Sequence, residues 1–153
     1  MALEEDPLSS TLHRKVGAAL FNRTWELLDR PRRSREEDEE MIHSAHASRY
    51  HWGRVGRPVN FSIAEWQLAR VYAVLGRAEP ARFHARRALE VAQRAHLGRF
   101  YVAYAYEALA RAEAVARRRG PRARYLKLAR TVGEGIRDAD DRRMLLEDLA
   151  TVQ

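Results

Sequence analysis

The chain has 153 residues and a formal net charge of +7, with 46% hydrophobic and 32% charged residues. This length and balance fit one globular domain and exclude an intrinsically disordered chain. Because the sequence has no cysteine, disulfides, thiolate metal ligands and cysteine nucleophiles are excluded as well.

The N-terminus and the distribution of apolar residues bear on localisation. The first residues include Glu4, Glu5 and Asp6, whereas a signal peptide begins with basic residues. No apolar run approaches the roughly 20 residues of a membrane span. We therefore expect a cytoplasmic protein that has no membrane partner.

Apolar residues recur with helical periodicity along almost the whole chain, and the breaks coincide with glycine, proline or capping residues. The expected helices, in chain order, cover about 9–30, 34–55, 62–76, 80–98, 99–120, 121–137 and 138–152. Nothing alternates with the period of a strand. The pattern predicts an all-α fold of about seven helices joined by short connections.

Capping sequences mark three of the expected helix starts. Ser34-x-x-Glu37 and Ser62-x-x-Glu65 each have the spacing of a capping box, in which two side chains satisfy free backbone amides. Asp138 can cap the last helix with its carboxylate.

Residues 68–76, Leu-Ala-Arg-Val-Tyr-Ala-Val-Leu-Gly, are followed by Ala81 and Ala88 and resemble a tetratricopeptide repeat. Small residues at these alanines let two antiparallel helices approach closely, Tyr72 fills the space between them, and Gly76 makes the turn. The family's tryptophan would fall at Glu65, so the match is incomplete. A second, longer unit follows it with weaker similarity.

The resemblance implies a right-handed stack of antiparallel helix hairpins within a single domain, 1–153. The expected parts are a flexible start at 1–8, a first hairpin at 9–57, the repeat-like hairpin at 60–96, a second such hairpin at 99–137, and a capping helix at 138–153.

In tetratricopeptide proteins the first helix of each pair lines a groove that binds extended peptides, so the resemblance implies a non-catalytic scaffold for a protein or peptide partner. Transferring the groove-facing positions onto this sequence gives Ile63, Trp66, Arg70, Ala73, Tyr104, Glu107 and Arg111. Trp66 could instead only staple the start of its own helix. Self-association into a homo-oligomer also stays open, because a stack of hairpins has two ends.

Histidines provide an alternative hypothesis. His43 and His46 lie on one helical face, with Glu40 three residues before His43, and His84 of a later helix could approach them. These three histidines could line a pocket for a divalent metal or a small ligand, or they could be ordinary hydrogen-bonded residues. No other cofactor is implied, and no nucleophile, P-loop or dinucleotide motif occurs. We expect no enzyme.

Arginines gather at two helix connections. Their members are Arg30, Arg32, Arg33 and Arg35 at the first, and Arg117, Arg118, Arg119, Arg122 and Arg124 at the second. Arginine suits phosphates, so nucleic-acid binding is a further alternative. Solvated helix ends, codon bias or a thermophilic source explain the same arginines, and on balance we expect no nucleic-acid partner.

Overall fold

The computed structural model describes residues 6–153, which form seven α-helices and no strand. The helices are α1 (Ser10–Leu28), α2 (Arg35–Val55), α3 (Pro58–Val74), α4 (Ala78–Arg94), α5 (Arg99–Val115), α6 (Arg119–Gly133) and α7 (Ala139–Ala150). The predicted all-α class and helix count are confirmed. None of these helices combines the length and the apolar character that crossing a bilayer would require.

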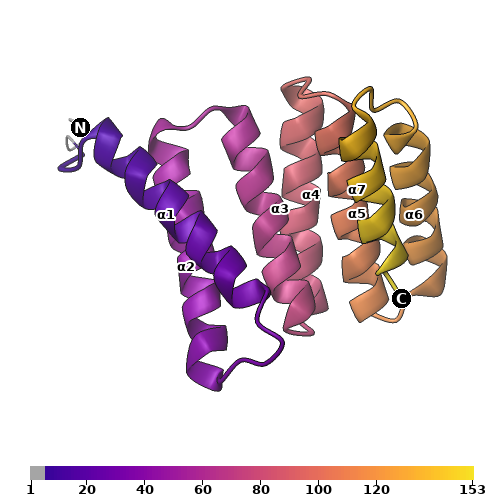
Figure 1. The fold of residues 1–153 in the computed structure, drawn as a ribbon, viewed down its shortest axis with the longest axis horizontal. Helices are drawn as coiled ribbons and strands as arrows, with labels where there is room; N and C mark the ends of the chain where they lie inside the picture. The colour runs from indigo at the N-terminus through magenta and orange to yellow at the C-terminus, as the bar shows by residue number, and fades with distance from the viewer. Residues whose placement is uncertain (1–5) are drawn as a thin grey trace.

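The helices pack in consecutive pairs, α1 with α2, α3 with α4, and α5 with α6. Figure 1 shows the pairs following one another along the longest axis of the molecule, with α7 lying over α5. The first helices of successive pairs also touch, α1 with α3 and α3 with α5. The three pairs therefore form a stack of hairpins with α1, α3, α5 and α7 along one side, and its right-handed sense stays a prediction.

Alanines make the close contacts within this stack. Ala81, Ala85, Ala88 and Ala92 of α4 are each at most 1% exposed and recur every three or four residues. They form one face of α4, which packs against both α3 and α5. Small side chains on this face let the three helix backbones approach closely, as the sequence predicts.

Left-handed residues end the first helix of two hairpins. Gly76 has φ +72°, and the following Arg77 amide donates to the Tyr72 carbonyl at 2.8 Å. At the equivalent place after α5, Arg117 has φ +57°. The expected end of that helix at Gly120 is therefore wrong, because Gly120 already lies in the first turn of α6.

The three predicted capping sites have different outcomes. The box at Ser34 and Glu37 forms, and Asp138 caps α7 as expected. The prediction of a capping box at Ser62 and Glu65 is wrong because α3 begins one turn earlier, at Pro58. The fixed φ of proline suits the first position of a helix.

Candidate binding pocket

A pocket of about 490 Å³ opens on the side of the stack that α1, α3, α5 and α7 form. Its lining consists of Trp25, Asp29, Ser62, Ile63, Trp66, Arg70, Phe100, Tyr101, Tyr104, Met144 and Asp148. Four residues that the sequence assigned to a groove, Ile63, Trp66, Arg70 and Tyr104, are in this lining. The side of the stack on which the resemblance predicts a groove therefore carries a hollow.

Five aromatic side chains form a continuous wall of the pocket. The Trp66 ring centroid lies 5.5 Å from that of Trp25 and 5.4 Å from that of Tyr104. The Phe100 ring continues the series, 4.9 Å from Tyr104 and 5.3 Å from Tyr101. Tilted and edge-to-face contacts of this kind hold aromatic rings in fixed orientations and leave a rigid apolar surface for a ligand.

A buried carboxylate holds the wall from below. Glu107 of α5 is fully buried and accepts hydrogen bonds from Trp66 Nε1 at 3.1 Å, an Arg70 guanidinium nitrogen at 3.2 Å and Arg111 Nε at 2.7 Å. An unpaired charge at such a depth would be strongly destabilising, so the two arginines stabilise Glu107 by compensating its charge. Glu107 thus lies beneath the pocket and fixes Trp66 and Arg70 instead of facing a ligand.

Arg111 connects this carboxylate to the last helix. Besides Glu107, its guanidinium donates to the Asp148 carbonyl oxygen at 3.1 Å and to Thr151 Oγ1 at 2.9 Å. Together with Ala73, another residue assigned to the groove from the sequence, Arg111 lines a separate smaller hollow near the C-terminus. Arg111 therefore docks α7, the helix whose Met144 and Asp148 line the main pocket, onto α5.

Tyr104 is the second link to α7. Its hydroxyl donates to Asp148 Oδ2 at 2.8 Å. Burial, followed by the hydrogen bond to the Asp148 carboxylate and its charge, raises the pKa of Tyr104 above its usual value, so the phenol stays protonated at neutral pH. Burial, then the neighbouring Arg111 charge, lowers the pKa of Arg70, while the charge of Glu107 opposes this shift.

Sequence reasoning missed seven lining residues. Phe100 and Tyr101 lie four and three residues before Tyr104, on the same helical face, so their spacing was a usable sign. Met144 and Asp148 enter because α7 folds back onto α5, which no local pattern encodes. The remaining three are Trp25, Asp29 and Ser62.

The histidines of the metal hypothesis are only partly brought together. The rings of His46 and His84 lie 5.4 Å apart, but His46 Nε2 bonds to Tyr72 Oη at 2.8 Å and His84 Nδ1 bonds to Glu65 at 2.7 Å. His43 is exposed on α2. Across residues 6–153, no group of three or more histidine, aspartate or glutamate side chains is arranged to hold a metal ion. His46 and His84 instead help join α2, α3 and α4.

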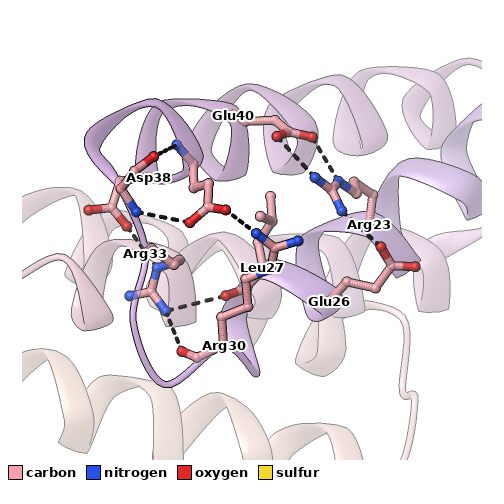
Figure 2. Close-up of polar contacts among 9 residues, drawn as sticks. Arg23, Glu26, Leu27, Arg30, Arg33, Asp38 and Glu40 are labelled. Carbon is pink, nitrogen blue, oxygen red and sulfur yellow. Dashed lines mark hydrogen bonds and ion pairs between the residues drawn. The ribbon is translucent and has the colours of Figure 1, made fainter.

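Three arginines of the first cluster form ion pairs with acidic residues at the start of α2. Figure 2 shows Arg33 bonded to Asp38 at 2.7 Å and to the carbonyl oxygens of Leu27 and Arg30. Arg30 pairs with Glu37, and Arg35 pairs with Glu39 at 3.1 Å. These contacts fasten the connection between α1 and α2 and neutralise most of its positive charge.

Arg23 extends the same ion-pair network along the hairpin. It bonds to Glu40 of α2 at 2.7 Å and to Glu26 at 3.0 Å (Figure 2). Glu40, which the metal hypothesis placed beside His43, is thereby committed to joining the two helices.

Searches against protein-family models, curated proteins and solved structures found no match to this chain. The tetratricopeptide resemblance therefore stays a prediction.

Proposed function

We propose that this protein is a non-catalytic helical scaffold that binds a short segment of a partner protein in the pocket between α1, α3, α5 and α7. The observation that carries the proposal is the five-ring aromatic wall around a hollow of about 490 Å³. Ligand pockets typically have volumes of about 300–1,000 Å³ and the same mainly apolar and aromatic lining. A pocket of this size accommodates one or two side chains of a peptide, with the rest of the peptide outside it.

Polar groups at the pocket suit a peptide backbone. Arg70 donates to Glu107 and to no other group in residues 6–153, so its remaining N–H groups are free for a carbonyl or carboxylate oxygen. Asp29 and Asp148 offer acceptors for backbone amides or for a basic side chain. The wall would bind an aromatic or large aliphatic side chain, and these polar groups would orient the chain around it.

A peptide library displayed on phage, with random 12-residue inserts, tests this proposal without a known partner. Selected peptides are synthesised with a fluorescent label, and their affinity is measured by fluorescence polarisation. Tyr101→Ala and Met144→Ala are the informative variants, because both side chains line the pocket and neither makes a side-chain hydrogen bond within residues 6–153. We expect a loss of about tenfold for Tyr101→Ala, as for an aromatic contact residue.

Phe83→Ala is the matched control, since Phe83 is an aromatic residue 59% exposed on α4 and outside the pocket. Its affinity should equal that of the wild type. Equal affinity in Tyr101→Ala, Met144→Ala and the wild type would refute the pocket as the binding site. Trp66→Ala and Arg70→Ala are poorer tests, because each also removes a hydrogen bond to the buried Glu107.

A further inference from the structure

The positive charge of the protein is concentrated in its second half. Residues 1–76 contain eleven basic and eleven acidic residues, whereas residues 77–153 contain seventeen basic and ten acidic residues. The whole net charge of +7 therefore arises after residue 76. Within this half, residues 117–130 contain seven basic residues and no acidic residue, which equals the net charge of the chain.

Helix α6 presents four of these seven basic residues on a single exposed face. Its exposed residues are Arg119, Gly120, Ala123, Arg124, Lys127, Arg130 and Thr131. At 100° per residue these side chains fall within an arc of about 140°. Four of the seven are basic, the other three are small, and none is acidic or a large apolar residue. We call these seven residues the basic face.

The charges of the basic face are unneutralised. Arg119, Arg124, Lys127 and Arg130 form no ion pair with any acidic side chain of residues 6–153. In the second arginine cluster Arg118 alone is paired within residues 6–153, with Glu113, whereas Arg30, Arg33 and Arg35 of the first cluster are all paired. From the sequence, both clusters are explained as solvated helix ends. The ion pairs of the structure show that the two clusters differ in how far their charge is neutralised.

The basic face is also sterically open. Helix α6 packs against α5 and α7 and against no other helix of the described chain. Figure 1 shows it at the end of the stack, beyond α5. A long, rigid partner can therefore lie parallel to α6 against the basic face without contacting another helix.

The composition of the face restricts the partner. Arginine forks bind phosphate oxygens in pairs, and the small residues between them let a backbone come close. Binding to a membrane surface would need large apolar side chains exposed on the basic face, and none of its seven residues is large and apolar. Binding to single-stranded nucleic acid uses exposed aromatic rings for base stacking, and Tyr125, the aromatic residue of α6, is half-buried beneath Arg124.

We propose that the basic face of α6 binds the phosphate backbone of a nucleic-acid duplex without reading its sequence. This binding is a second function, independent of the peptide pocket, and it would let the protein bring a partner held on the other helices to a nucleic acid. The four basic residues extend over twelve residues of helix, 119–130, or about 16 Å from the first Cα to the last, a length that reaches several phosphates of a duplex.

Fluorescence anisotropy with labelled 20-base-pair duplexes of DNA and of RNA tests the proposal at 50 to 200 mM NaCl. With about four phosphate contacts, affinity should fall by about 150-fold over this range, a slope of roughly −3.6. Changing Arg119, Arg124, Lys127 and Arg130 together to glutamine should weaken binding at least tenfold and reduce the slope to near zero. A difference between DNA and RNA would identify which duplex is the ligand.

A second quadruple variant removes the same amount of charge elsewhere. It changes the exposed Arg14, Lys15, Arg32 and Arg35 to glutamine, and we expect less than a threefold loss of affinity. Circular dichroism would verify that both variants stay helical. Equal losses in the two variants, or no binding at 50 mM NaCl, would overturn the proposal. Tighter binding to a single strand, to phosphatidylserine vesicles or to polyglutamate would overturn it as well.

Discussion

Replacing Glu107 with glutamine should destabilise the whole fold, although the two side chains have almost the same shape. Glu107 is fully buried, and the guanidinium groups of Arg70 and Arg111 lie within hydrogen-bond distance of its carboxylate. The variant leaves both cations without their counter-charge and turns one acceptor into an amide donor that faces them. Breaking a buried pair costs about 3–5 kcal/mol.

The partial exposure of the two arginines lowers the expected loss of stability. The side chains of Arg70 and Arg111 keep 21% and 15% of their exposure, so water partly solvates the cations that remain. We therefore expect a loss of about 2–3 kcal/mol in the free energy of unfolding. For a chain of this length, 1 kcal/mol corresponds to about 2–4 °C, so the melting temperature should fall by roughly 4–12 °C.

Urea and thermal unfolding, followed by circular dichroism at neutral pH, measure this loss. The control is Glu90→Gln, which removes an exposed pair with Arg87 on α4 and should change the free energy of unfolding by less than about 0.5 kcal/mol. A loss below 0.5 kcal/mol for Glu107→Gln would refute our argument that this carboxylate holds α3, α5 and α7 together.

Two further predictions concern pH and the turns. Burial, then the His84 charge, lowers the pKa of His46, so the unfolded chain takes up the proton more readily and the melting temperature should fall between pH 7.5 and pH 5.5. His46→Gln should lessen this fall, and an identical fall in the variant would contradict the assignment. Gly76→Ala should cost about 1–2 kcal/mol because Gly76 has φ +72°. Gly120 lies in a helical turn with open space around it, so Gly120→Ala should be neutral or stabilise the protein by up to about 1 kcal/mol. Equal losses in the free energy of unfolding for the two variants, measured by urea denaturation, would disprove this difference between the two glycines.

Helical periodicity was sufficient to predict the fold class and the hairpin order. The cap at Ser34 was predicted correctly because it depends on residues within one turn. The start of α3 was predicted incorrectly, because a proline such as Pro58 is found both after the end of a helix and at the first position of the next one. The end of α5 was also missed, since Arg117 adopts a left-handed conformation that sequence reasoning reserves for glycine.

The pocket was predictable only along α3 and α5. Ile63, Trp66 and Arg70 follow from the register of the repeat-like hairpin, and Tyr104 follows from the equivalent face of the next one. The α7 part of the lining depends on a long-range contact. Glu107 was assigned to the groove because it lies on the face of the fifth helix that is equivalent to the groove-facing side of the third, but it is fully buried. Its burial depends on donors 37 and 41 residues away in the sequence, Arg70 and Trp66, which no local pattern reveals.

The most direct test of the proposed pocket is an NMR titration that follows the three tryptophan indole N–H signals while a selected peptide is added. Trp25 and Trp66 line the pocket, whereas Trp52 packs against Gly17 and lines a different hollow. We predict that the indole signals of Trp25 and Trp66 shift and saturate with the peptide while the Trp52 signal stays in place. A saturating shift of the Trp52 signal alone would contradict the assignment of the binding site.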